Sequence, residues 1–225
     1  MNCIRTNFIR PDKRLIEKFS KISTPTVSDA MGRHFCMDSS IKPIYKNAKV
    51  VGPAFTVKTY PSDNLMCHIA LKMAMPGDVL VVDAGGYSNA GLWGELMSIA
   101  AKIKGLAGIV IDGGVRDCNE IEAMDFPVFA KGINARGGYK TNPGSLNCTI
   151  ACGGIAVDAG DIIIADENGV VVIPRTSAEE VYERSIKKVE DEKQIKERLF
   201  KGEALFDLLD LEKAVTKLNL TLIED

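Results

Sequence analysis

The sequence predicts a single α/β domain with parallel β-α-β units, a β-rich second half and C-terminal helices. Two apolar runs, 79–82 and 108–111, each follow a segment with helical periodicity, which is the order of a crossover helix and a parallel strand. Residues 148–174 alternate short apolar runs with turn residues, as strands and hairpins do. A highly charged stretch after residue 176 keeps helical spacing.

The chain begins with two short helical segments. Apolar residues within 11–22 recur at helical spacing, and Ser23-Thr24-Pro25 is a typical start for a second helix. We therefore expect one domain of 225 residues, with an N-terminal helical arm (1–35), a core (36–175) and C-terminal helices (176–225).

The sheet is expected to begin at residues 49–60, which predict either a strand pair or one long bent strand, broken near Gly52-Pro53. A helix over 64–75 and an apolar strand over 79–83 complete the first β-α-β unit. The glycine-rich turn Gly85-Gly86 leads into the second.

The second unit consists of a helix over 92–104 and the strand at 108–111. Two successive crossovers imply neighbouring parallel strands. Helical spacing predicts that four apolar side chains face the core, namely Leu96, Ile99, Ala100 and Ile103.

Beyond residue 120 the pattern changes. Residues 127–130 predict a short strand, and 132–147 form a polar loop rich in glycine, asparagine and proline. Asn168-Gly169 predicts a hairpin between two apolar runs. A charged helix is expected over 177–201 and a second amphipathic helix over 204–218.

Composition excludes several classes of protein. The chain is 46% hydrophobic with a formal net charge of -2, so it lacks the basic excess that holds a nucleic-acid backbone. No apolar run approaches the roughly 20 residues of a membrane span, and the N-terminus lacks the apolar core of a signal peptide. We expect a cytoplasmic protein whose six cysteines, without a CxxC pair, are reduced thiols.

One cluster of charges follows the strand at 108–111. Asp112, Arg116, Asp117 and Glu120 fall within nine positions, and Gly113-Gly114 gives the backbone freedom to bring them together. The end of a strand in an α/β sheet is where ligands usually bind. A surface salt bridge, or an aspartate that caps the short helix after it, explains the same residues without a ligand.

A second cluster precedes the predicted helix at 92–104. Gly94, Glu95 and Leu96 open that helix, whose first amides are free donors that attract anions. An acidic residue near the positive end of a helix dipole is the simpler interpretation.

Other polar residues are expected to be structural. His34 and His68 lack a carboxylate partner within their own motifs, so each is predicted to be a satisfied structural histidine. Asp63-Asn64 is predicted to be a helix cap or surface pair, and Asp83 is the best candidate among the remaining polar residues.

Known nucleotide and hydrolase motifs are absent. The sequence has no G-x-G-x-x-G fingerprint, no G-x-x-x-x-G-K-[ST] loop and no G-x-S-x-G elbow. The run 109–116 is similar to the phosphate site of a (β/α)8 barrel, but such a barrel needs eight strand and helix pairs where two are found.

These motifs, in this order, resemble the family of class II 4-hydroxy-4-methyl-2-oxoglutarate aldolases and the related regulators of ribonuclease E activity. The resemblance covers about 23–174. It rests on Ser28-Asp29-Ala30, Asp63-Asn64, Pro76 to Asp83, Gly94-Glu95-Leu96, Asp112 to Asp117 with Glu120, Phe126 to Phe129, and Gly160-Asp161 followed by Asp166 to Pro174.

The resemblance implies a swivelling β/β/α sandwich that assembles as a homotrimer or hexamer. By the same resemblance, Arg116 binds the pyruvyl group, Asp117 holds a divalent metal, Mg²⁺ or Mn²⁺, and Glu120 supports the metal's water shell. The amides of Gly94, Glu95 and Leu96 would hold the substrate carboxylate. A neighbouring subunit would supply a C-terminal glutamate, for which Glu192 is the candidate and Glu190 the alternative. Asp112 is then structural.

The implied activity is a metal-dependent lyase that cleaves a 4-hydroxy-2-oxo acid to pyruvate plus an oxo acid and also decarboxylates oxaloacetate. Glu95 and Glu120 favour this branch, in which Arg116, Asp117 and Glu95 are catalytic. The family's regulators share the core without a complete metal set and bind a ribonuclease E-like protein, which is the alternative. The extra segment after 204 departs from the family pattern.

Overall fold

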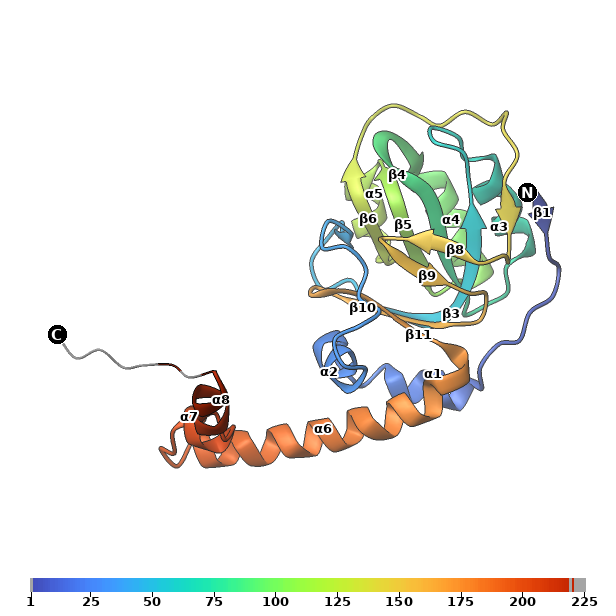
Figure 1. Cartoon of the computed structure of the whole chain (residues 1–225). Coiled ribbons are helices and arrows are strands. Elements are labelled where there is room, and N and C mark those ends of the chain that lie inside the picture. The colour runs from blue at the N-terminus through green and yellow to red at the C-terminus, as the bar shows by residue number, and fades with distance from the viewer. Residues whose placement is uncertain (1, 219, 221–225) are drawn as a thin grey trace.

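Four parallel strands form the centre of the main sheet in the computed structural model, which describes residues 2–218 and 220 (Figure 1). Each strand is joined to the next by a helix, and all three helices contribute to one hydrophobic cluster on one face of the sheet. These elements are β3 (Val50–Lys58), α3 (Leu65–Met73), β4 (Val79–Trp93), α4 (Glu95–Lys104), β5 (Gly108–Val115), α5 (Cys118–Ala123) and β6 (Val128–Ile133).

The two predicted crossovers are confirmed, and the structure adds a third through α5. That helix is the short helix expected after Asp117, and with the strand predicted at 127–130 it completes this third crossover. Short strands β1 (Cys3–Ile4), β7 (Ser145–Leu146) and β2 (Lys42–Pro43) flank the four, in the order β1-β7-β3-β4-β5-β6-β2.

Strand β3 is one long strand that serves two sheets. Its first half, Val50–Pro53, pairs antiparallel with β10, and its second half, Ala54–Lys58, pairs parallel with β4. A Cβ on Gly52 would lie 2.4 Å from the carbonyl oxygen of Gly77, so this crossing point requires glycine. Of the two alternatives for residues 49–60, the single bent strand is correct.

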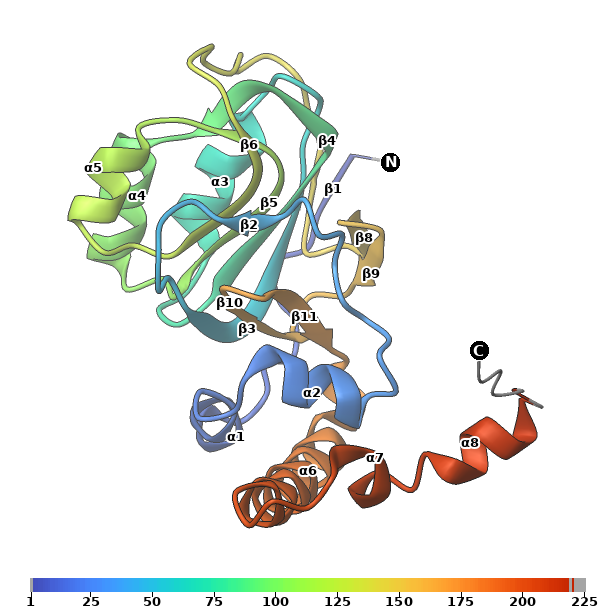
Figure 2. The same cartoon turned by 90° about the vertical axis from the view of Figure 1, so that its left-hand side faces the viewer.

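Two hairpins cover the other face of the sheet, where a second hydrophobic cluster lies between the layers (Figures 1 and 2). Asp166 pairs with Gly169 and so closes the predicted hairpin, whose central residues are Glu167 and Asn168. The four strands are β8 (Ile150–Cys152), β9 (Ile155–Val157), β10 (Ile162–Asp166) and β11 (Gly169–Ile173).

Three helices pack on the outer side of β10 and β11, around Phe19, Val27 and Val181. The predicted N-terminal arm is therefore a layer of the fold, and its first residues form β1 rather than a helix. The elements of this layer are α1 (Lys13–Phe19), α2 (Thr24–Ala30), the 3-10 turn η1 (Arg175–Ser177) and α6 (Ala178–Leu199).

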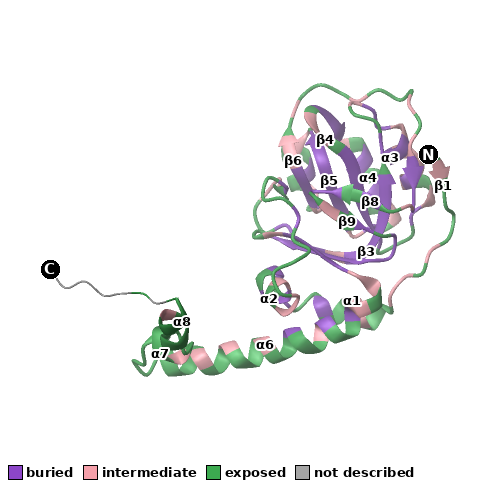
Figure 3. Ribbon diagram, viewed as in Figure 1, coloured by how far each residue is buried: buried purple, intermediate pink, exposed green. Residues whose placement is uncertain are grey.

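Helix α6 runs beyond the body, and its second half has largely exposed side chains (Figures 1 and 3). The helix predicted over 204–218 is wrong in form, because two short helices, α7 (Leu205–Leu208) and α8 (Glu212–Lys217), stand in its place. Asp210 interrupts them with a φ of 52°, which a continuous helix does not allow. Residues 219 and 221–225 of the expected C-terminal segment lie outside the described residues.

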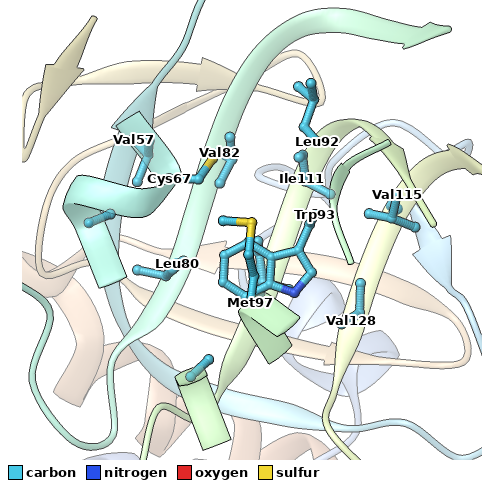
Figure 4. Close-up of a cluster of buried hydrophobic side chains, with 14 of the residues drawn as sticks. Val57, Cys67, Leu80, Val82, Leu92, Trp93, Met97, Ile111, Val115 and Val128 are labelled. Carbon is cyan, nitrogen blue, oxygen red and sulfur yellow. The ribbon is translucent and has the colours of Figure 1, made fainter. Parts of the chain in front are cut away.

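Helix α4 differs from the prediction in its start and in its buried face. Leu92 and Trp93 end β4 rather than begin the helix, and Met97 and Ala101 face the core (Figure 4). Leu96 is 78% exposed and Ile103 84% exposed, although the helical pattern predicted them inward. Ile99 and Ala100 are exposed as well.

A hydrogen bond fixes the rotation of α4. The buried Trp93 Nε1 donates to Ser98 Oγ at 2.7 Å, and Ser98 Oγ donates to the carbonyl oxygen of Gly94 at 3.1 Å. An unpaired buried indole N–H is costly, so this bond stabilises the orientation in which Ser98 faces the core and Leu96 does not. In the described part of the chain, no helix combines the length and the apolar character needed to cross a bilayer.

Candidate active site

A cavity of about 380 Å³ opens at the carboxyl ends of β4 and β5, where the two parallel strands pass into their helices. Its size is that of a site for a small organic ligand. The residues that line it are Asn64, His68, Gly91, Leu92, Trp93, Gly94, Glu95, Leu96, Met97, Arg116, Asp117, Gly137, Gly138 and Lys140.

Asp117 lies at the N-terminus of α4. It follows β5 in the left-handed conformation, with a φ of 58°, and its Oδ2 accepts a hydrogen bond from the Glu95 N–H at 3.0 Å. It occupies the N-cap position of α5, but its side chain makes no capping bond there. The cap that the sequence suggests is thus made to α4, whose dipole favours a negative charge at this point.

Glycine makes this contact possible. A Cβ on Gly94 would lie 2.4 Å from Asp117 Oδ2, and a Cβ on Gly91 would lie 2.9 Å from the Cβ of Arg116. Gly94 has an extended backbone, with a φ of -159°, so the requirement is steric rather than conformational. These glycines let the ends of β4 and β5 approach closely.

Arg116 lies beside Asp117 in the cavity wall. Its Nε is 3.5 Å from Asp117 Oδ2, and its backbone N–H donates to the Trp93 carbonyl oxygen at 2.9 Å. The side chain is 46% exposed, so the guanidinium can reach a ligand in the cavity. Gly137 lies against it, since a Cβ there would be 3.2 Å from Nη1.

Five of the seven residues singled out from the sequence line this one cavity: Gly94, Glu95, Leu96, Arg116 and Asp117. We call these five the arginine-aspartate wall. Glu120 is exposed on α5 outside the lining. Glu192 lies on α6, with Oε2 4.0 Å from Lys196 Nζ, and is not part of the cavity of its own chain.

Asn64, His68 and Lys140 form a part of the lining that the sequence did not predict, and we call it the histidine-lysine wall. His68 Nε2 and Asn64 Oδ1 are buried without a hydrogen-bond partner among the described residues. The prediction of a satisfied structural histidine is therefore wrong. Burial, followed by the charge of Lys140, lowers the pKa of His68. The i, i+4 spacing of Asn64 and His68 was the available signal.

Asp63 holds the loop that carries Lys140. Its fully buried carboxylate accepts hydrogen bonds from the N–H groups of Leu65, Thr141 and Asn142 at 2.7 to 2.9 Å. Burial acts to raise the pKa of Asp63, but these hydrogen bonds lower it overall. Asp63 thus binds the first amide of α3, just before the N-cap residue Asn64, and also anchors a loop far along the chain.

Asp112 and Asp83 have structural contacts outside the cavity. Asp112 accepts from the Gly153 N–H at 3.1 Å and lies 3.3 Å from Lys131 Nζ. Asp83 pairs with Lys58 at 2.9 Å. The expectation that Asp112 is structural agrees with these contacts.

The donor set of the cavity suits a hard cation that keeps much of its water. Among residues 2–218 and 220, no three or more His, Cys, Asp or Glu side chains are grouped to hold a metal ion. Both contacts of Asp117 use Oδ2, which leaves Oδ1 available, and Glu95 adds a second carboxylate to the lining. One or two carboxylates with water are typical ligands of Mg²⁺, whereas structural zinc needs four protein ligands.

Comparison with known proteins identifies the family. Residues 24–172 match the RraA-like model, described as Aldolase/RraA. The chain belongs to the aldolase/RraA family. The family resemblance inferred from the motifs is thereby confirmed, and the barrel alternative is wrong.

Relatives within the aldolase/RraA family cover most of the chain. A Halalkalibacterium halodurans protein named "Putative 4-hydroxy-4-methyl-2-oxoglutarate aldolase" is 38% identical over 200 residues, 89% of this chain and 95% of that one. An uncharacterized protein of Methanocaldococcus jannaschii is 40% identical over 202 residues, 88% of this chain and 95% of that one.

A solved structure from Streptomyces coelicolor shows the family fold. It is described as an unusual member of the RNase ES inhibitor RraA protein family, and it is 28% identical with a TM-score of 0.77. The match covers 84% of this chain and 100% of that one. The predicted α/β fold is confirmed.

Proposed function

We propose that the protein is a divalent-metal-dependent aldolase that cleaves 4-hydroxy-4-methyl-2-oxoglutarate, or a similar 4-hydroxy-2-oxo acid, to pyruvate plus a second oxo acid. The observation that carries this proposal is the arginine-aspartate wall, which combines a cation, a carboxylate and a helix N-terminus in one cavity. Similarity to the named H. halodurans protein supports it. Oxaloacetate decarboxylation is proposed as a second reaction of the same site, because it also leaves the electron pair of the broken bond on a pyruvyl group.

The arginine-aspartate wall offers donors for the 2-oxo acid end of the substrate. Of the three amides that the resemblance implies, those of Gly94, Glu95 and Leu96, the Glu95 N–H already donates to Asp117 Oδ2. The Leu96 N–H and the next amide, that of Met97, lie in the first turn of α4, where backbone donors lack partners within the helix. They can bind the carboxylate, as helix N-termini bind anions. Arg116 then donates hydrogen bonds to the 2-oxo oxygen, where negative charge develops.

Mg²⁺ or Mn²⁺ bound at Asp117 would polarise the 2-oxo group and so stabilise the developing charge. Glu95 and Glu120 are proposed to bind water around the ion, together with Glu192 of a neighbouring subunit. The proton of the 4-hydroxyl group passes to Glu95, directly or through a water, as the bond between C3 and C4 breaks. The electron pair of that bond moves into the pyruvyl half, where Arg116 stabilises it, and C3 then takes up a proton.

Assembly as a homotrimer or hexamer is part of the proposal. Leu96 lines the cavity, and Leu96, Ile99 and Ile103 are exposed apolar side chains of α4, a surface typical of a protein contact. A subunit placed there would bring its own residues close to the cavity.

The test is an assay of pyruvate release from 4-hydroxy-4-methyl-2-oxoglutarate and from oxaloacetate, with and without a chelator. We expect release from both acids, loss of release after chelation, and recovery when Mg²⁺ or Mn²⁺ is added back. Chelator-insensitive release would contradict the metal-dependent mechanism.

A second candidate is a regulator that binds a ribonuclease E-like protein. Similarity to the S. coelicolor structure favours it, since that protein is described within an RNase inhibitor family. Absence of activity on both acids, together with direct binding to a purified ribonuclease E-type enzyme and its inhibition, would select this candidate over the aldolase.

A further inference from the structure

We infer that Lys140, supported by His68 and Asn64, binds the second carboxylate of a dicarboxylic substrate, on the half that leaves as the second oxo acid. The inference rests on the proposed function, because it assumes that the arginine-aspartate wall takes the 2-oxo acid end. It assigns a task to a wall of the cavity that the mechanism above does not use.

The charges of the cavity indicate a ligand with two anionic ends. Two cationic side chains, Arg116 and Lys140, line it. Arg116 is paired with Asp117, whereas Lys140 takes part in no ion pair within the described ranges. Lys140 is an exposed residue of the lining, and a ligand carboxylate in the cavity would accept a charge-assisted hydrogen bond from its ammonium group.

The loop around Lys140 is held in place before any ligand binds. The Tyr139 N–H donates to the Ser62 carbonyl oxygen at 2.8 Å, and the Asn64 N–H donates to the Tyr139 carbonyl oxygen at 2.8 Å. On the other side of Lys140, the Thr141 N–H donates to Asp63 at 2.7 Å. Residues 139 and 141 are therefore both anchored to the start of α3, which places the lysine at the cavity and reduces the entropic cost of binding.

Two unpartnered polar atoms belong to the same wall as this lysine. His68 Nε2 and Asn64 Oδ1 are buried, belong to lining residues and have no partner in the described part of the chain. Buried polar atoms in proteins are almost always hydrogen bonded, so these two indicate a polar group that arrives with the ligand. A carboxylate beside a hydroxyl group supplies both acceptor and donor atoms, as the 4-hydroxy acid end of the substrate does.

The test compares equilibrium binding of 2-oxoglutarate and 2-oxopentanoate by titration calorimetry in the presence of Mg²⁺. These two five-carbon acids share the 2-oxo acid end and differ in that a methyl group replaces the second carboxylate. We expect the wild type to bind 2-oxoglutarate about ten to a hundred times more tightly, as one charge-assisted hydrogen bond would give.

In Lys140→Met this preference should fall to about twofold or less, and Lys140→Arg should keep part of it. Arg136→Met is the matched control, because Arg136 lies in the same loop but does not line the cavity, and it should keep the preference. Arg116→Met should weaken the binding of both acids equally, because both carry the 2-oxo acid end that Arg116 is proposed to bind.

The inference would be overturned if Lys140→Met kept the preference for 2-oxoglutarate, or if it lost affinity for both acids equally. A wild type without a preference would overturn it as well. The outcome is separable from the proposed function. If the wild type releases no pyruvate but shows a preference that depends on Lys140, the proposed function fails and the inference stands. If pyruvate is released and Lys140→Met keeps the preference, only the inference fails.

Discussion

The two walls of the cavity are built in different ways. The arginine-aspartate wall comes from two turns that each follow a strand, and its key residues, Arg116 and Asp117, are adjacent in the sequence. The histidine-lysine wall joins α3 to a loop more than seventy residues later through the buried carboxylate of Asp63. The first wall could therefore be found as a motif, whereas the second exists only once the chain has folded.

The comparison also separates two kinds of chemistry. In the arginine-aspartate wall, Asp117 is held by the Glu95 N–H and by Arg116. The histidine-lysine wall keeps two buried atoms and one cation without partners in the described residues. The mutual contact of Arg116 and Asp117 fits the proposed reacting end, where geometry must be fixed, and the unpartnered groups fit the proposed recognition of the other end.

The substitution with the largest expected effect tests whether the reacting end of the substrate binds at the arginine-aspartate wall. Asp117→Ala should lower kcat for pyruvate release about 10²- to 10³-fold, because it removes the proposed metal ligand and the cap of α4. Steady-state kinetics with added Mg²⁺ measures the effect. Asp207→Ala, which removes an exposed carboxylate on α7, is the control and should keep full activity. A fully active Asp117→Ala variant would show that the reacting end of the substrate does not bind at this wall.

A second substitution tests the close approach within the same wall. Gly94→Ala places a methyl group 2.4 Å from Asp117 Oδ2 and should displace that carboxylate, lowering kcat/KM about ten- to a hundredfold. If the effect acts through Asp117, it should largely disappear when the same change is made in the Asp117→Ala background. Equal effects in both backgrounds would show that Gly94 acts by another route.

The third prediction concerns the rotation of α4, on which the arginine-aspartate wall depends. Ser98→Ala should lower the free energy of unfolding by about 1 to 3 kcal/mol, because the buried Trp93 Nε1 loses its acceptor. Urea denaturation measures the change. Ser20→Ala, at an exposed hydroxyl that bonds only to the Glu17 carbonyl oxygen, should change it by less than about 0.5 kcal/mol. Similar values for both variants would contradict the role of Ser98.

The smallest expected effect sharpens the description of the histidine-lysine wall. Burial and the charge of Lys140 lower the pKa of His68, so Lys140→Met should raise it, and Arg136→Met should leave it unchanged. Titration of the imidazole followed by NMR measures both. If the His68 pKa is unchanged in Lys140→Met, the charge of Lys140 does not influence His68.

The same shift has a consequence for stability. Because the pKa of His68 is lower in the folded state than the ordinary value of 6.5, the unfolded chain binds the proton more tightly. The His68 contribution to stability is therefore present above that value and is lost as the pH falls from it toward the lower folded-state pKa. Lys140→Met should reduce this loss, which denaturation at several pH values can measure.

Local pattern was enough for most of the fold. Apolar runs at 79–82 and 108–111, with helical segments between them, determined neighbouring parallel strands, since a crossover has a fixed hand. Asn168-Gly169 determined the hairpin. The motif from Gly113 to Asp117 determined that charged side chains lie at the end of β5, because these residues directly follow the strand in the sequence.

Only the tertiary structure decided which face of α4 is buried: Met97, Ser98 and Ala101 face the core, with Ser98 bonded to the buried Trp93, and the larger Leu96, Ile99 and Ile103 face outward. It also decided that Asp117 caps α4 rather than its own helix, since the close approach of two strand ends is not visible along the chain. His68 and Lys140 became neighbours of that site for the same physical reason: burial and partnership are properties of contacts between distant segments. The sequence by itself determined the family and the arginine-aspartate motif, and folding decided what faces it.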